Sequence, residues 1–366
     1  MTSPAAKRAT RFSFFFFATL MLCVTPVMAQ QFVAINAPGA NATLPVAIND
    51  LGQIVGYLYD SSGNQHGFLL VAGVYQLIDF PGALITACTG INNSGNIVGE
   101  YNDINNAPHG FSLINGVFTT IDDPAFPNGT YPSQISDPGL IAGIGFDAQN
   151  VAHGFTFANN TFTTIDYPGS VFSQILDMSL NGLEFVGVYG PPSYPTQGYQ
   201  GFTDINGVFT SVTYPGSAST QLNGVTNAGL VAGTYYLPDQ AVSHVFLFNG
   251  TTYTTEDFPG AVSDGASNMN DLGDVVGEYF DGNNNIHGYV MTNGPFAYVA
   301  NINSNSVSMI DILLTLPVAT IPVGAGPWGV ALSPSGKQVY VSNNHENDVS
   351  VIDTASSAVI ATIPVQ

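Results

Sequence analysis

Short apolar stretches alternate with polar turns along most of the chain, and no window has the i, i+3, i+4 spacing of an amphipathic helix. Residues 89–121 show the pattern clearly. A short strand at 89–92 and a strand at 97–101 are followed by a polar loop, and a third strand at 110–113 leads through the hairpin turn Asn115-Gly116 into a fourth at 117–121. The hydrophobic pattern therefore predicts an all-β chain built from units of four strands.

Three markers recur in a fixed order and show that these units are repeats. A glycine that closes an apolar pair recurs at spacings of 43 to 46 residues, at Gly56, Gly99, Gly143, Gly187, Gly233 and Gly277. About ten residues later comes a motif that resembles His-Gly-Phe, and most units end on an aromatic residue or Asp before Pro. Four strands in each of six such repeats predict a β-propeller with six four-stranded blades.

The N-terminal segment supplies a strand that the sixth unit lacks. That unit has three strands, and its expected fourth strand is matched by Phe32 to Asn36, followed by Ala37-Pro38-Gly39. We expect this strand to complete blade six, because a closed ring leaves no open sheet edge. Residues 30–294 are thus predicted to form a six-bladed propeller closed by its N-terminal strand.

A different repeat begins at Phe296. Ala297 to Asn301 recurs as Val339 to Asn343, and two further segments also recur 42 residues on. Residues 295–366 are therefore predicted to hold an incomplete second set of blades. The alternative is that these strands join the first ring and make a single ring of seven or eight blades.

Both repeats resemble known families. The six units at about 30–294 resemble the extracellular HAF-family repeat, with His-Gly-Phe in place of His-Ala-Phe. The last 70 residues are similar to YVTN-family β-propeller repeats, whose motif appears as Tyr298-Val299-Ala300-Asn301 and Tyr340-Val341-Ser342-Asn343. The resemblance implies bacterial proteins that are secreted or held at the cell surface, and it brings no shared catalytic motif.

Residues 1–29 have the layout of a secretory signal peptide: basic residues, an apolar run from Phe12 to Val24, and Val27-Met28-Ala29 before a cleavage point after Ala29. We therefore expect a secreted or surface-attached protein. The remaining chain has one lysine, Lys337, against 25 acids, which gives a net charge of −24. Nucleic-acid backbones and anionic lipids need clustered basic residues, so both are excluded as partners. No later apolar run approaches the ~20 residues of a membrane span.

Five histidines occupy one position of the repeat, at the start of the third strand: His66, His109, His153, His244 and His287. A metal ring is one hypothesis, because neutral imidazole is a common ligand. Yet this position spreads the histidines around the ring, and Gln200 replaces one of them, so we interpret them as structural repeat positions. The recurrent loop aspartates are explained as turn formers, with weak Ca²⁺ binding in the loops as the alternative. No other cofactor is indicated. Cys88 would be a buried free cysteine once Cys23 is removed.

No catalytic motif of the hydrolase, zinc-protease or phosphate-loop kind is present. The leading interpretation is a monomeric binding or structural module, whose partner is a surface glycan or a protein, and not an enzyme. The alternative is a propeller hydrolase with a carboxylate site at the channel mouth, made from Glu100, Glu278 or Glu184.

Overall fold

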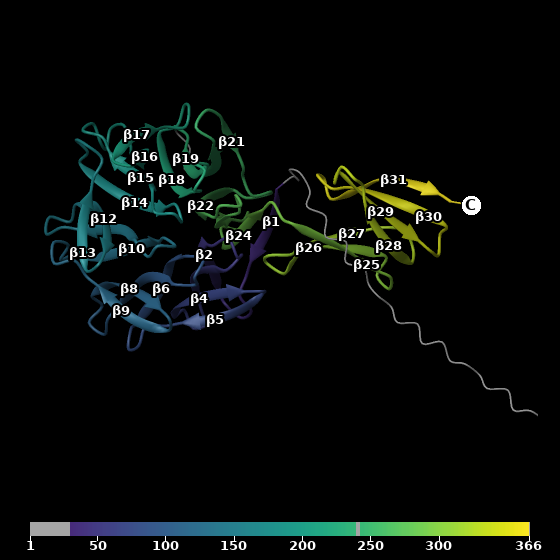
Figure 1. Ribbon diagram of the computed structural model, residues 1–366, viewed down its shortest axis with the longest axis horizontal. Helices are drawn as coiled ribbons and strands as arrows, with labels where there is room; N and C mark the ends of the chain where they lie inside the picture. The colour runs from purple at the N-terminus through teal and green to yellow at the C-terminus, as the bar shows by residue number, and fades with distance from the viewer. Residues whose placement is uncertain (1–29, 239–241, 366) are drawn as a thin grey trace, which may run out of the picture.

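Six four-stranded antiparallel sheets surround one axis in the computed structural model, which describes residues 30–238 and 242–365 (Figure 1). Blade one contains β2 (Ala42–Ile48), β3 (Ile54–Tyr59), β4 (Gln65–Val71) and β5 (Val74–Ile78). Blade two contains β6 (Ile85–Ile91), β7 (Ile97–Asn102), β8 (Pro108–Ile114) and β9 (Val117–Ile121). Blade three contains β10 (Thr130–Ile135), β11 (Ile141–Phe146), β12 (Ala152–Ala158) and β13 (Thr161–Ile165).

The second half of the ring has the same construction. Blade four contains β14 (Phe172–Met178), β15 (Glu184–Gly190), β16 (Gln200–Ile205) and β17 (Val208–Val212). Blade five contains β18 (Ser219–Val225), β19 (Val231–Tyr236), β20 (Ser243–Phe248) and β21 (Tyr253–Thr255). Blade six contains β22 (Ser263–Met269), β23 (Val275–Phe280), β24 (Ile286–Thr292) and, from the N-terminus, β1 (Gln31–Ile35).

The ring is closed in two ways. The first strand of every blade packs against the first strand of the next blade, and β22 packs against β2. In addition, β1 pairs with β24 in antiparallel register from Gln31–Thr292 to Ile35–Gly288. The predicted six-bladed propeller, with its N-terminal closing strand, is confirmed.

The repeated glycine and aromatic markers explain how the blades pack. Each third strand carries a fully buried ring: Phe68, Phe111, Phe155, Phe202, Phe246 and Tyr289. A Cβ on Gly99 would lie 2.1 Å from the carbonyl oxygen of Ala87 and 2.7 Å from the ring of Phe111. Only glycine fits there, because the neighbouring ring and strand fill the space.

Residues after Gly294 form two further sheets beside the ring (Figure 1). Sheet seven has three strands, β25 (Phe296–Asn301), β26 (Ser306–Asp311) and β27 (Leu316–Pro322). Sheet eight has four, β28 (Pro327–Leu332), β29 (Gln338–Asn343), β30 (Asp348–Asp353) and β31 (Ala358–Pro364). The alternative of a single seven- or eight-bladed ring is wrong, because β22 already packs on β2 and leaves no gap for another blade.

Sheet seven is attached to the ring by its β26–β27 turn. Leu314 from this turn belongs to the apolar cluster of blades one and six, together with Ile48 and Leu70. The hydroxyl of Thr292 donates to a carboxylate oxygen of Asp311 at 2.6 Å. Among the described residues no helix is long and apolar enough to cross a membrane.

Candidate functional site

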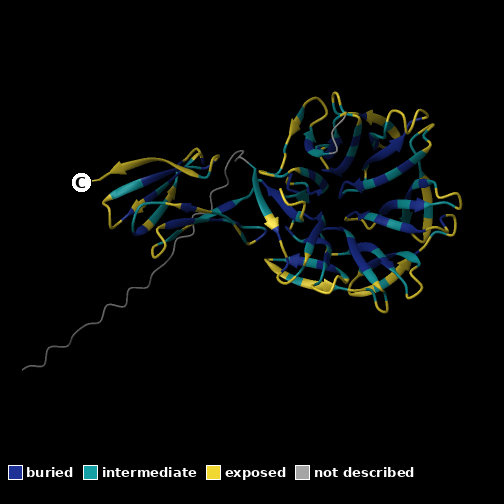
Figure 2. Cartoon of the chain, turned by 180° about the vertical axis from the view of Figure 1, so that it is seen from behind, coloured by how far each residue is buried: buried dark blue, intermediate teal, exposed yellow. Residues whose placement is uncertain are grey.

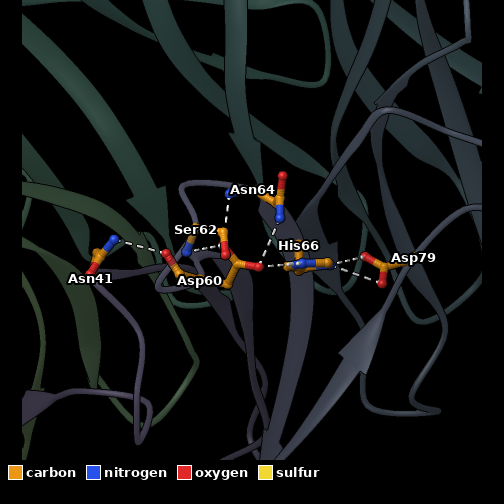
Figure 3. A network of polar contacts seen from close by, with 6 residues as sticks. All are labelled: Asn41, Asp60, Ser62, Asn64, His66 and Asp79. Atoms are coloured by element: carbon orange, nitrogen blue, oxygen red, sulfur yellow. Dashed lines mark hydrogen bonds and ion pairs between the residues drawn. The ribbon is translucent and has the colours of Figure 1, made fainter.

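The repeated histidines lie on one face of the ring, which we call the loop face. It carries the loops between second and third strands and the corners that lead from each fourth strand to the next blade. In blade one, His66 stands between Asp60 of the loop and Asp79 of the corner (Figure 3). Its Nδ1 is 3.0 Å from Asp79 and its Nε2 is 3.7 Å from Asp60.

Blades two and three repeat this arrangement, and blade five repeats the histidine–corner pair. Nδ1 of the histidine is 2.8 to 2.9 Å from the corner carboxylate in the pairs His109–Asp122, His153–Asp166 and His244–Asp257. Nε2 is 3.9 Å from the loop carboxylate in His109–Asp103 and 3.6 Å in His153–Asp147. Burial lowers the pKa of His153, but the hydrogen bonds and charges of Asp166 and Asp147 outweigh burial and raise the pKa overall.

Two blades depart from this arrangement. In blade four, Gln200 stands in place of histidine and Thr213 in place of the aspartate. The Tyr189 hydroxyl donates to Gln200 Oε1 at 2.8 Å there. In blade six the closing strand brings Asn36 to the corner position, and His287 Nε2 is 3.3 Å from the loop carboxylate of Asp281. Blade four thus replaces the histidine and the corner aspartate together, whereas blade six keeps the histidine and the loop aspartate and changes the corner residue.

The loop aspartates also shape the turns that carry them. Asp60 Oδ1 accepts the backbone N–H groups of Ser62 and Asn64, both at 2.8 Å (Figure 3). The Asn64 side chain donates to Oδ2 at 2.9 Å, and these hydrogen bonds lower the pKa of Asp60. Asp103, Asp147 and Asp281 make equivalent turns, and hydrogen bonds from their loops lower their pKa values as well.

A small pocket lies beside the histidine of blade one. It has a volume of about 240 Å³ and is lined by Gln65, His66 and the residues from Asp79 to Thr86. Polar imidazole and carboxylate groups therefore meet the Phe80-Pro81-Gly82 corner on the solvent side of the blade boundary.

In other blades a tyrosine ring stacks on the histidine imidazole. The ring centroids are 5.0 Å apart for Tyr101 and His109 and 5.2 Å apart for Tyr235 and His244.

Each corner is fastened to the first strand of the following blade by one side chain. In five blades a side-chain hydroxyl on the first strand accepts the corner N–H at 2.9 to 3.1 Å. These hydroxyls belong to Thr43, Thr86, Thr130, Ser173 and Thr220. In blade six a carboxylate does this instead: Asp264 Oδ2 accepts from Phe258 N at 2.6 Å. Burial raises the pKa of Asp264 to about 7, and the charge of Asp257 adds to the effect.

A buried carboxylate links several blades close to the axis. Asp177 on β14 accepts hydrogen bonds from Gln134 Nε2 at 3.0 Å, Asn268 Nδ2 at 2.8 Å and Val225 N at 2.9 Å. Asn268 Oδ1 in turn accepts from Ile48 N at 3.1 Å, so five blades share the network. Burial raises the pKa of Asp177 to about 7, although its hydrogen-bond donors favour the charged form.

The opposite face of the ring, which we call the turn face, carries a closed belt of hydrogen bonds between the turns after the first strands. Each turn donates a backbone N–H to the turn of the next blade. The successive donors are Asp50, Asn93, Asp137, Asn181, Asn227 and Asp271, and Asp271 donates back to Asp50 at 2.8 Å. Apart from the Leu180 carbonyl, every acceptor is a side-chain oxygen. The belt thus joins all six blades.

The three glutamates considered for catalysis do not form one cluster. Burial raises the pKa values of Glu100 and Glu278, on the second strands of blades two and six. The pKa of Tyr57 in blade one is raised to about 12, mainly by burial and further by the negative charges of Glu278 and Glu100. Glu184 instead lies beside the blade-five turn at Gly229, on the turn face. Two of the three glutamates therefore flank one tyrosine, and the third is elsewhere.

Cys88 is buried and free, and burial raises the pKa of its thiol well above the ordinary value. Within residues 30–238 and 242–365 no group of three or more His, Cys, Asp or Glu side chains could hold a metal ion.

The sequence did not reveal the axial network or the turn belt. The signal of the axial network is that Gln134, Asp177 and Asn268 stand at one repeat position, where other units have Ala47 or a glycine.

The fold and strand order define a β-propeller with six blades and two additional sheets. No family model matches the chain, and no characterised protein matches its sequence. Among solved structures it is similar to the β-propeller domain of the Trilobed protease from Pyrococcus furiosus, at 10% identity and a TM-score of 0.45, over 88% of this chain and 92% of that one. It is also similar to TolB from Acinetobacter baumannii, at 11% identity and a TM-score of 0.43, over 83% and 74% of the two chains. A streptogramin B lyase is 14% identical, with a TM-score of 0.43, over 85% and 94%.

Proposed function

We propose that this protein is a secreted or cell-surface β-propeller whose loop face binds carbohydrate or protein ligands through repeated sites. The observation that carries the proposal is the pocket at the blade-one corner, where the His66–Asp79 pair lines a hollow of about 240 Å³. Blades two, three and five repeat the histidine–aspartate pair. Several equivalent sites on one face would bind a repetitive surface far more tightly than any one site, because the second contact is intramolecular.

The chemistry of the site favours a neutral, hydroxyl-rich ligand. Imidazole and carboxylate groups donate and accept hydrogen bonds in defined directions, and the corners add apolar and aromatic surface. Residues 30–294 contain neither Lys nor Arg, so an anionic ligand would meet repulsion without a counter-charge. A glycan is therefore the preferred ligand, and a protein surface the second.

Blade four offers a matched test of this proposal, because it carries Gln200 and Thr213 where other blades carry histidine and aspartate. The four-blade variant would combine these substitutions: H66Q with D79T, H109Q with D122T, H153Q with D166T, and H244Q with D257T. We expect the parent protein to bind a subset of a glycan array and the variant to lose that binding with its thermal transition retained. A variant that keeps full binding would refute the role of these sites, and a control with blade one alone changed should lose only part of the avidity.

A hydrolase with an axial carboxylate site is the second candidate. It is favoured by Glu100 and Glu278, two half-buried carboxylates with raised pKa values that stand at the repeat position of Tyr57, on the blades to either side of it. A raised pKa suits a general acid. Activity on a panel of chromogenic glycosides, esters and lactones that disappears in both E100Q and E278Q would establish it. Activity that survives both substitutions would remove these residues from consideration.

Secretion and the domain boundaries are further parts of the proposal. N-terminal sequencing of the exported protein is expected to begin at Gln30, and we propose residues 30–294 and 295–366 as separate domains. Retention of the protein inside the cell, with residues 1–29 intact, would contradict the secreted location.

A further inference from the structure

Sheets seven and eight are related by the 42-residue repeat and pack face to face. Sheet seven contributes Tyr298, Val307, Ala319, Ile321 and Val323 to the interface, and sheet eight contributes Val330, Leu332, Val339, Val341 and Ile352. Val307 and Ile321 are 0% and 2% exposed, so this contact is closely packed. The pair therefore shows how one unit of this repeat covers the next.

The repeat identifies a second copy of the same face on the far side of sheet eight. The residues 42 positions after the sheet-seven contacts are Tyr340, Val349, Ala361, Ile363 and Val365. We call these five residues the outer face. Ile363 is 46% exposed and Val365 49%, whereas their counterparts in sheet seven lie in the buried interface. Strand β31 is exposed along its whole length (Figure 2).

A pocket of about 200 Å³ opens on this outer face, lined by residues that include Val349, Val365 and Asn347. In sheet seven the counterpart of Asn347 is Asn305, whose side-chain oxygen accepts from Gly326 N at 3.1 Å. That bond holds the connection through which the chain enters sheet eight. The pocket thus lies where a following unit would be received.

Sheet seven carries the complementary half of the same contact. Ala297, Val299 and Ile310 are the counterparts of Val339, Val341 and Ile352, which contact sheet seven from sheet eight. Val299 is 41% exposed, so the ring does not cover this surface. We call these three residues the inner face. The molecule therefore presents an uncovered apolar surface at one end of the pair and, at the other, the counterparts of three of the five sheet-eight contact residues; Val330 and Leu332 lie on β28, which has no counterpart in sheet seven.

We propose that a second copy of this chain docks here, its inner face on the outer face of sheet eight, as a repetition of the contact already made within the chain. This contact is heterologous, because two different surfaces meet, and it can close into a ring or continue. It replaces the expectation of a monomer. Exposed apolar residues on a sheet face that ends in the unpaired edge of β31 are also where association is expected on general grounds.

The test uses the full mature chain and two single variants, one for each surface: I363D on the outer face and V299D on the inner face. Light scattering after gel filtration, from about 1 to about 100 μM, should show the parent protein as multiples of the monomer mass. Each variant alone should be monomeric, with association weakened at least about tenfold by a charge in an apolar contact. An equimolar mixture of the two variants should form a one-to-one dimer, because each retains the surface that the other lacks.

Three outcomes would overturn the proposal. A parent protein that stays monomeric throughout the concentration range would show that the outer face has no second copy as its partner. Association retained by V299D but not by I363D would show a symmetric contact between two outer faces. Association unchanged in both variants would place the contact elsewhere. Substitution I104D on the 78% exposed Ile104 of a ring loop is the control for charge alone and should change nothing.

Discussion

Replacing Asp264 by threonine should stabilise the ring at and above neutral pH. Five blades use a hydroxyl to accept the corner N–H, and only blade six uses a carboxylate. Asp264 is 2% exposed, and burial is the main reason that its pKa is raised to about 7. Threonine would keep the acceptor for Phe258 N and remove a buried negative charge beside Asp257.

The size of the effect follows from the raised pKa. An unfolded aspartate has a pKa of about 3.9, so the shift is about three units, and at about 1.36 kcal/mol per unit the ionised form costs up to about 4 kcal/mol. Below pH 4 the carboxyl is protonated in both states and this cost is absent. Between pH 4 and 7 the folded state binds the extra proton, so the stability of the parent protein falls as the pH rises. D264T should therefore match the parent near pH 4 and exceed it at pH 8.

Urea unfolding of the parent and D264T at pH 4, 6 and 8 measures this difference. The reciprocal substitution T220D in blade five is the matched control, because Thr220 Oγ1 accepts from Tyr214 N at 3.0 Å in the equivalent corner. T220D should lose stability at pH 8 by a similar amount and much less at pH 4. A D264T variant with the same advantage at every pH, or with none at pH 8, would refute the reasoning.

The remaining predictions concern the axis, the closing strand, acid stability and the domain boundary. N268L removes an amide that bonds Asp177 and Ile48, and should cost about 3 kcal/mol at pH 8 in urea unfolding but less at pH 4. F32A removes an aromatic side chain of the closing strand, 5.5 Å from Phe258, and should lower the free energy of unfolding of the propeller by about 2 kcal/mol. F296A, which removes a buried aromatic side chain of sheet seven, outside the propeller, is the comparison. Hydrogen bonds depress the pKa values of four loop aspartates, so the stability that they contribute is lost as the pH falls below about 4; these are Asp60, Asp103, Asp147 and Asp281. Asp177 and Asp264 have raised pKa values and lower the stability as the pH rises above about 4, so thermal melting should show maximal stability near pH 4 to 5. Residues 30–294 expressed alone should melt cooperatively, and aggregation would contradict the proposed boundary.

The blades were predictable because the same four-strand pattern recurs six times in the sequence. The closing strand was predictable for the same reason, since Phe32 to Asn36 matches the fourth strands that precede the other corners. The turn belt was not, because its hydrogen bonds join turns at least 43 positions apart, and each Asp or Asn there looks like an ordinary turn former.

Departures from the repeat were harder to interpret than the repeat itself. Glu184 was considered together with Glu100 and Glu278, but it begins β15, whereas the other two follow the glycine marker near the other end of the second strand. The position of a residue along the second strand determines whether it lies near the loop face or the turn face of the propeller. Glu184, at the start of β15, therefore lies near the turn face. Asp177 and Asp264 each replace residues that are uncharged in all five other blades, and aligning the six units would have singled out both.

The pairing of β1 with β24 also sets the order in which the protein can be completed. The first strand to be made finds its partner only after all six blades have been synthesised, so the decisive contact is separated by nearly the whole ring. Contacts of such long sequence separation form slowly, because a large loop must close before the pairing is gained. Until then the edge of β24 and the strand β1 are both unpaired, and the growing chain is open to pairing with its neighbours during synthesis or export.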